Sequence, residues 1–289
     1  MTTGEWLREW YELYVDGSDL APNTQGMYRR SINALPEWLL RIPLEDLTPM
    51  DVYRHVKLRA KKEPRAAQLD RVTLSRAIKI AAKCGLRAPM ALDMDTCPTP
   101  KHKARETAIL TQTEAARYVE YARQSPVAPL LMLCLCGLRR GEALGLQWRD
   151  VDLQTGEISI KRQRQRVNGE YVFRPLKTSK SVRRFTAPQQ LLEVLRIWPR
   201  KLRASCVCDI TPEQLQREHV RVIEAAGLPR VTLHGLRHTM ATLAVGAVPM
   251  KTLQVALGHS TYQLTADLYA DHLSPLSPVQ NVVWSGFVS

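Results

Sequence analysis

A proline-containing segment from residue 88 to 111 divides this sequence into two parts that are expected to fold separately. Proline lacks a backbone donor and restricts the residue before it, so the segment favours a linker over a helix or a strand. A chain of 289 residues is long enough for two ordinary domains. We therefore predict one domain at residues 1–100 and a second at 101–289. The cations of the linker are Lys101, Lys103 and Arg105.

The first hundred residues predict a domain built only of helices. Trp6, Trp10 and Leu13 recur with the spacing of one helical face. Further along, Thr48 and Pro49 mark a helix start, because threonine caps the first turn and proline fits within it. Both patterns are typical of amphipathic helices that bury one face in a core.

The longest predicted helix of this part runs from about residue 65 to 83 and carries cations along one face. Arg76, Lys79 and Lys83 are spaced i, i+3 and i+7, and apolar residues lie roughly opposite. One face can therefore pack on the domain, while the other either faces solvent or lies on phosphates. We predict these three residues as DNA contacts.

The second part mixes helices with a small antiparallel β-sheet. The apolar run at 130–138 predicts a buried helix, and alternation near 158–160 predicts a strand. Asn168-Gly169 is a strong hairpin signal, and a further strand at 182–185 is predicted to follow a hairpin turn at 176–180. The fold class is therefore mainly α with a small antiparallel β-sheet. Further helices are predicted at 188–197, 212–226, 235–245, 250–257 and 261–270.

The chain is strongly and unevenly basic. Its formal net charge at pH 7 is +13. The first 100 residues carry 15 basic and 13 acidic side chains, whereas the remainder carries 26 and 15. DNA attracts such charge through counterion release, although a solvated surface or an acidic lipid patch would also use it. The excess of basic side chains favours nucleic acid as the partner.

Several protein classes are excluded by composition. No apolar run approaches the roughly 18 residues that cross a bilayer. The N-terminus shows no signal-peptide pattern, and six cysteines are too sparse for a secreted disulfide scaffold. A cytoplasmic, nucleoid-associated protein is expected. The single Cys206-Val-Cys208 pair is a weak metal signal, and Cys134 and Cys136 are predicted as core residues, so neither a metal nor another cofactor is expected.

Residues suited to phosphate chemistry recur in five short segments. His234 and Arg237 lie three residues apart at a predicted helix start, where both can face one point and where the backbone favours an anion. Arg139 supplies a second guanidinium, and two such permanently charged forks suit phosphate oxygens. The segments are Cys136-Gly-Leu-Arg-Arg-Gly-Glu-Ala-Leu-Gly-Leu146, Leu176-Lys-Thr178, His234-Gly-Leu-Arg-His238, Leu257-Gly-His-Ser260 and Thr265-Ala-Asp-Leu-Tyr269.

In this order the five segments resemble the tyrosine recombinase, or phage integrase, family, most strongly from Arg139 to Tyr269. The resemblance implies a two-domain DNA clamp, with a SAM-like helical core-binding domain before an α+β catalytic domain. It implies a site-specific DNA recombinase or integrase that cuts and rejoins DNA through a covalent 3′-phosphotyrosyl intermediate, without metal or ATP. Because Trp6 already lies in the first core-binding helix, the arm-site domain of longer members is expected to be absent, as in short Xer-like members.

The resemblance implies a role for each matching residue. Arg139 and Arg237 bind the scissile phosphate, with Glu142 supporting Arg139. His234 accepts or shuttles a proton, which its ordinary pKa allows near neutral pH. Tyr269 is the nucleophile that attacks phosphorus.

At other positions of the pattern, two residues remain candidates for the same role. Lys177 resembles the general acid toward the leaving 5′ oxygen, with Lys180 as its rival and a further DNA contact. His259 resembles the residue that hydrogen-bonds the phosphate, and Tyr262 is the rival nucleophile. His238 is predicted to be structural. The histidines that match no motif are His55, His102, His219 and His272, and Asp271 stands where the family often has a histidine.

The resemblance also implies assembly on double-stranded DNA. Four protomers would synapse two recombination sites, with accessory bending or directionality factors as further partners. The C-terminal tail at 273–289 carries apolar residues that suit either docking on a neighbouring subunit or packing on its own domain. Two alternatives use related features: a type IB topoisomerase with similar chemistry, and a catalytically silent DNA-binding regulator.

Overall fold

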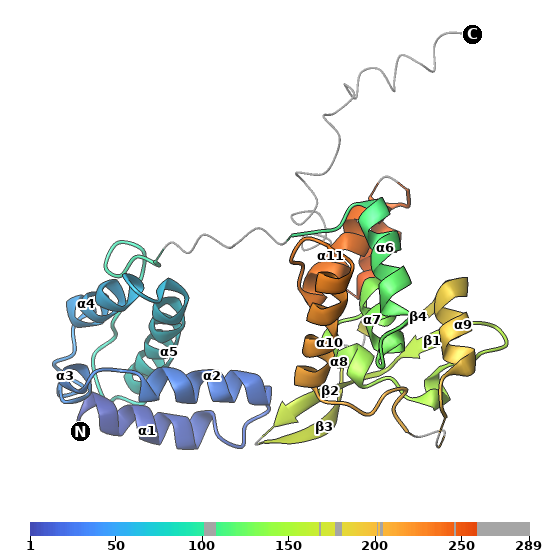
Figure 1. Ribbon diagram of the computed structural model, residues 1–289. Helices are drawn as coiled ribbons and strands as arrows, with labels where there is room; N and C mark the ends of the chain where they lie inside the picture. Colours follow the sequence, from blue (N-terminus) through green and yellow to red (C-terminus); the bar gives the residue numbers. More distant parts are fainter. Residues whose placement is uncertain are drawn as a thin grey trace, which may run out of the picture. The chain divides into compact units, whose positions relative to one another are not determined.

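The computed structural model describes residues 1–100, 108–167, 169–176, 181–200, 202, 205–245 and 247–258. The chain divides into two compact units, Met1–Arg105 and Glu106–Ser289 (Figure 1). This division falls inside the basic linker, five residues beyond the predicted boundary at residue 100. No helix among the described residues is long and apolar enough to cross a membrane.

The first unit is helical throughout its described part. Its elements are α1 (Thr3–Tyr14), α2 (Pro22–Asn33), α3 (Glu37–Leu40), α4 (Pro49–Ala60) and α5 (Pro64–Lys83). Trp6 and Trp10 of α1 are buried as predicted, but Leu13 is 66% exposed. The prediction for Leu13 was wrong because Leu7 and Tyr11, and not Leu13, complete the buried face of α1 beside the two tryptophans. The short helix α3 was not predicted.

The predicted helix start at Thr48 is confirmed. The Thr48 side-chain oxygen accepts a hydrogen bond from the Asp51 backbone nitrogen at 3.3 Å, and the Asp51 carboxylate accepts one from the Thr48 backbone nitrogen at 3.0 Å. Pro49 occupies the first turn, where its missing N–H costs no helical hydrogen bond.

A buried polar cluster joins α2, α4 and α5. The Asp70 carboxylate on α5 accepts hydrogen bonds from Ser31 Oγ at 2.6 Å, His55 Nε2 at 2.9 Å and Arg59 Nη1 at 2.6 Å. Asp70 is 1% exposed, so these donors replace the water that a buried carboxylate loses. His55, which matched no sequence motif, therefore serves the fold.

The second unit combines helices with short antiparallel strands, as predicted. Its first elements are α6 (Gln112–Ala122), α7 (Ala128–Leu135), α8 (Arg140–Leu144) and a 3₁₀ turn, η1 (Trp148–Asp150). The strands are β1 (Glu157–Ile160), β2 (Arg162–Val167), β3 (Glu170–Pro175) and β4 (Arg183–Thr186). The last described helices are α9 (Gln189–Ile197), α10 (Pro212–Ala225), α11 (Leu233–Ala244) and α12 (Met250–Leu257).

The apolar run in the second unit forms the centre of its core. Every residue of α7 from Ala128 to Cys134 is buried, and α6, α9 and α11 pack around this helix (Figure 1). Such burial on all sides explains why the run lacks a polar face. The helix ends at Leu135, earlier than predicted, and the chain then turns through Gly137.

The four described strands form two antiparallel pairs. β1 and β2 follow each other along the chain, separated only by Lys161, and each pairs with one later strand. β2 pairs with β3 through the predicted hairpin, in which Gly169 has a φ of 91°. β4 then pairs with β1, with Ile160 opposite Arg183. The prediction of a hairpin turn at 176–180 was wrong, because β3 pairs with β2 and β4 with β1, so β3 and β4 do not pair with each other.

Candidate functional site

A glycine turn places Arg139 at the start of α8. Gly137 follows α7 with a φ of 92°, a conformation that L side chains rarely adopt. A Cβ atom at this position would lie 2.2 Å from Met240 Cε, so the turn also requires a small residue. Arg139 is consequently the N-terminal capping residue of α8, one turn before Glu142.

The predicted contact between Arg139 and Glu142 is present. Arg139 Nη1 donates to Glu142 Oε1 at 2.8 Å, and the Arg139 backbone nitrogen donates to Oε2 at 2.9 Å. Glu142 is 2% exposed, whereas the Arg139 side chain is 38% exposed. Burial raises the pKa of Glu142, but hydrogen bonds and charge from Arg183 and Arg139 outweigh it and lower the pKa overall. Glu142 is therefore ionised at neutral pH.

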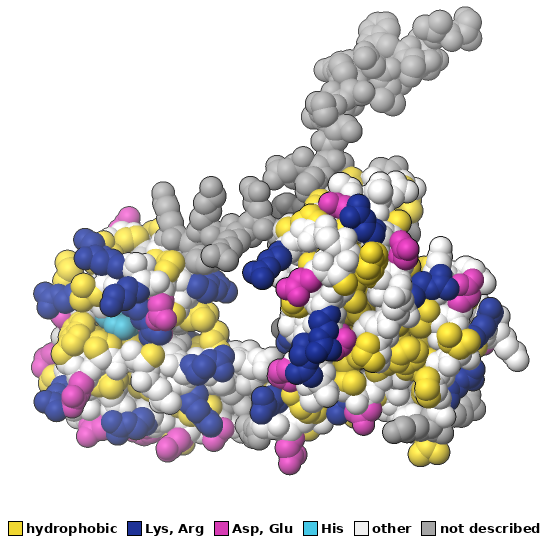
Figure 2. All heavy atoms as spheres, in the orientation of Figure 1, with side chains coloured by type: hydrophobic (Ala, Val, Ile, Leu, Met, Phe, Trp, Pro, Cys, Tyr) yellow, Lys and Arg dark blue, Asp and Glu magenta, His cyan; other side chains and the backbone are white. Residues whose placement is uncertain are grey.

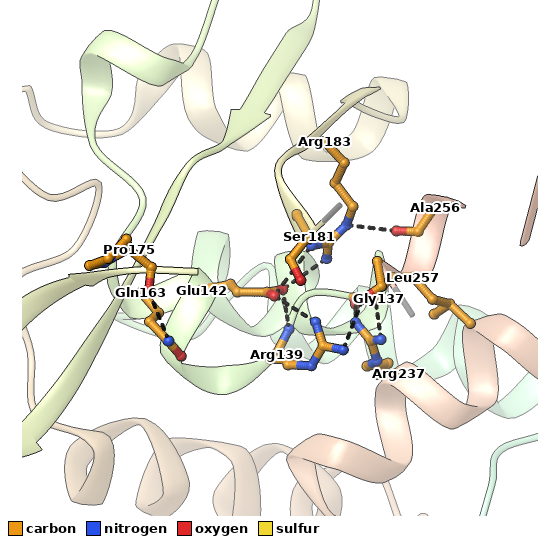
Figure 3. Close-up of polar contacts among 11 residues, drawn as sticks. Gly137, Arg139, Glu142, Gln163, Pro175, Ser181, Arg183, Arg237, Ala256 and Leu257 are labelled. Carbon is orange, nitrogen blue, oxygen red and sulfur yellow. Dashed lines mark hydrogen bonds and ion pairs between the residues drawn. The ribbon is translucent and has the colours of Figure 1, made fainter. Parts of the chain in front are cut away.

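Arg183 is a third guanidinium in this cluster and was not predicted. It extends from β4 and makes a two-pronged ion pair with Glu142, with Nη2 2.8 Å from Oε2 and Nη1 3.2 Å from Oε1 (Figure 3). Strand alternation offered a signal, because Arg183 and Phe185 share one face of the predicted strand. An arginine on the same strand face as a phenylalanine indicates a buried, paired charge.

Three arginines converge on the C-terminal end of α12. Arg183 Nε donates to the Ala256 carbonyl at 2.7 Å, Arg237 Nη2 to Leu257 at 2.6 Å and Arg139 Nη2 to Gly258 at 3.2 Å. Figure 3 shows these side chains reaching the helix end from β4, α11 and α8. The last carbonyls of a helix lack helical donors and carry partial negative charge, so cations stabilise this end.

Arg139 and Arg183 share the single carboxylate of Glu142, so the cluster has excess positive charge. Arg237 is 3% exposed and also donates to the Gly137 carbonyl at 2.6 Å, which fixes the turn before Arg139. Glu142 pairs with Arg139 and Arg183, whereas Arg237 also reaches the Leu257 carbonyl at the end of α12. A cluster of this charge, with the Arg139 side chain partly exposed, suits binding of a phosphate oxygen.

His234 begins α11 beside these arginines. The Thr232 side chain caps the helix by accepting from the Gly235 backbone nitrogen at 2.9 Å, and Arg237 follows one turn after His234. The His234 ring lies edge-on to the His238 ring, with centroids 4.6 Å apart.

The surroundings of His234 favour its neutral form. Burial and then positive charge from His238, Arg237 and Arg139 lower the pKa of His234 to about 4. Burial and the neighbouring cations act in the same direction, because both disfavour the charged imidazolium. The sequence-based expectation of an ordinary pKa for His234 was therefore wrong. The ring is neutral at pH 7, and a neutral imidazole has a nitrogen that can accept a proton.

Several predicted site residues lie outside the described part of the chain. α12 ends at Leu257, and Gly258 follows in a left-handed conformation with a φ of 63°. The residues outside the description are the predicted general acid Lys177 and its rival Lys180, the predicted phosphate contact His259, the predicted nucleophile Tyr269 and its rival Tyr262, and the linker cations Lys101, Lys103 and Arg105.

The predicted DNA-contacting face of α5 is exposed in the first unit. Arg76, Lys79 and Lys83 all lie on the surface, although Arg76 also donates to the Tyr28 hydroxyl at 3.0 Å. Other cations of this unit are used internally, since Arg71 and Arg87 donate to backbone carbonyls. Figure 2 shows basic side chains over the visible face of each unit, with acidic ones among them.

His219 and the buried cysteines serve the fold, whereas His102 and His272 lie outside the described residues. His219 is buried between Tyr118 and the Val231 carbonyl, with hydrogen bonds of 3.0 and 2.7 Å. Cys134 is buried as predicted, and Cys136 is half-buried. Burial raises the pKa of Cys208 to about 12. Within the described ranges, no group of three or more His, Cys, Asp and Glu side chains could hold a metal ion.

Curated relatives match part of the chain. A XerC-like tyrosine recombinase from Caldanaerobacter subterraneus subsp. tengcongensis is 29% identical over 210 residues, covering 61% of this chain and 54% of the relative. The ICEBs1 integrase of Bacillus subtilis is 30% identical over 159 residues, covering 49% and 43%. The chain thus spans about half the length of these relatives.

Solved structures share the fold over nearly the whole chain. The Tn1549 transposon integrase, in complex with a circular intermediate DNA, superposes with a TM-score of 0.80 at 17% identity and covers 100% of both chains. A lambda integrase dimer bound to a core site gives a TM-score of 0.70 at 21% identity, covering 96% of this chain and 99% of the other. The phage integrase family model matches residues 103–274, more than half of the sequence, and the chain therefore belongs to the phage integrase family.

Proposed function

We propose that this protein is a site-specific DNA recombinase that cuts and rejoins DNA through a covalent 3′-phosphotyrosyl link to Tyr269. The observation that carries the proposal is the convergence of Arg139 and Arg237 on the C-terminal end of α12, with Arg139 held by the buried Glu142, directly before the segment that contains Tyr269. This cluster offers the positive charge that a phosphoryl transfer requires at its transition state.

The proposed reaction conserves the energy of the phosphodiester. The Tyr269 oxygen attacks phosphorus, the bond to the 5′ oxygen breaks, and a phosphotyrosyl ester remains on the 3′ side. Neutral His234 accepts the phenolic proton, and Lys177 donates one to the leaving oxygen. A 5′ hydroxyl from a partner strand then attacks the phosphotyrosyl link, restoring both the DNA backbone and the tyrosine.

Arg139 and Arg237 serve as the phosphate-binding pair in this scheme. Their guanidinium groups are anchored from two elements and carry permanent charge. Because the charge is already positioned, it stabilises the pentavalent transition state without the reorganisation that water would require. The cluster therefore supplies by itself the stabilisation that other phosphoryl transferases obtain from a metal ion.

Double-stranded DNA and copies of the chain are the proposed partners. The related Tn1549 structure is a complex with circular intermediate DNA, and a lambda integrase tetramer has been solved on a Holliday junction. By analogy we propose a tetramer on two recombination sites. The cations on α5 and in the linker would contribute contacts with backbone phosphates.

Covalent trapping tests the proposed function. The full chain is incubated with nicked duplexes that tile the flanks of its own gene, so that cleavage releases a short strand and traps the adduct. The parent protein and Tyr262→Phe should form a protein–DNA adduct, whereas Tyr269→Phe should form none and still bind DNA. An adduct formed by Tyr269→Phe would refute the assignment of the nucleophile.

A topology assay separates recombination from its closest alternative. Plasmids with two target sites should yield exchanged products that migrate as new circles. Relaxation of single circles without exchange would replace the proposal with a type IB topoisomerase activity. Binding without an adduct on any duplex would instead favour a DNA-binding regulator.

A further inference from the structure

Arg183 is a buried cation that the proposed reaction has not yet used. Its side chain is 4% exposed and extends from β4 to partners on α8 and at the end of α12. Burial removes an arginine from water at a cost that only well-placed hydrogen bonds and a matched charge offset, so the contacts of Arg183 indicate a specific role.

The first contact of Arg183 is with the carboxylate that also holds Arg139. Glu142 Oε1 accepts from Arg139 Nη1 at 2.8 Å and from Arg183 Nη1 at 3.2 Å. Oε2 accepts from the Arg139 backbone nitrogen at 2.9 Å and from Arg183 Nη2 at 2.8 Å. Two guanidinium charges thus share one negative charge. Without Arg183, Glu142 and Arg139 would neutralise each other.

The second contact of Arg183 is with the end of α12. Its Nε donates to the Ala256 carbonyl at 2.7 Å. A Cβ atom on Gly258 would lie 3.0 Å from Arg183 Nη1, so the guanidinium also packs against the turn that ends the helix. Arg183 therefore links Glu142 directly to the helix end that Arg139 and Arg237 contact.

We propose that Arg183 is a positioning residue of the DNA-cleavage site: it neutralises Glu142, leaves the charge of Arg139 available to the scissile phosphate, and fixes the end of α12. The inference rests on the proposed function and assigns Arg183 no contact with the phosphate itself. Its effect on the reaction passes through Arg139 and through the geometry of the helix end.

Single-turnover cleavage by the full chain tests this role. Arg183→Gln should cleave a saturating nicked duplex about 100-fold more slowly, because small displacements of reacting groups cost about that much. The rate reports only folded, DNA-bound molecules, so a loss of stability does not lower it. Arg183→Lys should recover about tenfold of the loss, since it keeps the charge but not the fork. A parent-like rate in Arg183→Gln would overturn the proposal.

Arg184→Gln is the matched control. Arg184 is the next residue of β4, and its side chain is 67% exposed and pairs with Glu157 at 3.3 Å. Its removal should leave the cleavage rate within about twofold, as expected for a surface ion pair. Equal losses in both variants would mean that any arginine of this strand matters, and the specific role would be refuted.

A substrate without charge at the scissile phosphate separates electrostatics from general disruption. A methylphosphonate there replaces one negatively charged oxygen with a methyl group. If Arg183 acts through the charge of Arg139, the loss in Arg183→Gln should shrink from about 100-fold to about tenfold on this substrate. A loss of equal size on both substrates would overturn the electrostatic role.

Amide hydrogen exchange of the DNA-free protein tests the anchor independently of catalysis. Arg183→Gln should speed exchange at residues 255–258, whereas Arg184→Gln should not. Unchanged exchange in Arg183→Gln would refute the role at the helix end. If exchange rises but the parent forms no adduct on any duplex, the proposed function fails while the anchor stands.

Discussion

The two units each bury a carboxylate among cations, and they use it differently. Asp70 in the first unit and Glu142 in the second are 1% and 2% exposed. Asp70 joins three helices through Ser31, His55 and Arg59. Glu142 joins α8 and β4 through Arg139 and Arg183. These two arginines and Arg237 also donate to carbonyls at the end of α12.

The balance of charge distinguishes the two clusters. Around Asp70 the Arg59 side chain is 20% exposed and also faces Glu63 at 3.4 Å, so local cations and anions are matched. Around Glu142 arginines are in excess, and Arg139 is 38% exposed. In these two clusters, the carboxylate with matched charges anchors the fold, whereas the carboxylate with surplus, accessible cations belongs to an anion site.

Removal of Arg237 should produce the largest effect on chemistry. Arg237→Gln loses donors to Gly137 and Leu257 and one permanent charge. We expect single-turnover cleavage to fall about 1,000-fold, with DNA affinity changed much less. Arg196→Gln, an exposed arginine of α9, serves as the control in the same unit. A reduction of less than tenfold would assign the phosphate site to other residues.

Removal of the charge on Asp70 should affect stability and not chemistry. Asp70→Asn leaves Arg59 without its buried partner, and breaking such a pair costs about 3 kcal/mol. Denaturant unfolding of the full chain measures this loss, with the exposed Asp46→Asn as the control. The cleavage rate of bound, folded molecules should stay within about threefold of the parent rate. A large loss of cleavage rate without a loss of stability would mean that Asp70 serves the reaction and not the fold.

The pH dependence of stability should reveal the burial of His234 and the positive charge around it. The folded pKa of about 4 lies below the ordinary value of 6.5, so the unfolded chain binds more protons between these values. Stability should therefore fall as the pH drops from 6.5 toward 4, and His234→Gln should flatten that decline. Denaturant titrations at several pH values measure the slope. An unchanged slope would mean that neither burial nor the neighbouring cations lower the pKa of this histidine.

The α5 lysines should give the smallest effect, because they act as individual phosphate contacts. Lys79→Gln combined with Lys83→Gln should weaken DNA binding about tenfold and reduce the slope of log affinity against log salt by about 2. Neither change should affect thermal stability, since both side chains are exposed. Lys61→Gln with Lys62→Gln is a matched double control in the same unit. An equal loss in the control would show that α5 is not a preferred contact.

The sequence predicted the elements whose signals are local. Thr48 and Pro49 marked the start of α4, and the Asn168-Gly169 hairpin and the buried run of α7 were identified from their own residues. The prediction that Leu13 lies on the buried face was wrong, because a three-residue pattern does not determine which neighbouring positions complete that face. The pairing of β4 with β1 was missed because it joins residues that are distant in sequence.

The site was predictable in its residue types but not in its connections. Arg139, Glu142, His234 and Arg237 stood out by spacing, whereas the contacts that bring them to one helix end depend on tertiary packing. Arg183 was missed because its partner lies 41 residues away. The lowered pKa of His234 likewise arises from burial and from neighbouring cations, and the burial depends on tertiary packing that spacing cannot reveal.

The decisive measurement identifies the residue that becomes covalently linked to DNA, which we propose is Tyr269. The sequence after Lys251 contains neither lysine nor arginine, so trypsin releases one peptide, 252–289, that holds both Tyr262 and Tyr269. Cleavage before Asp267 and Asp271 then separates the two tyrosines. Mass spectrometry of the trapped adduct should find the nucleotide on fragment 267–270, which contains Tyr269. A nucleotide on fragment 252–266, or on any peptide outside 252–289, would contradict the account.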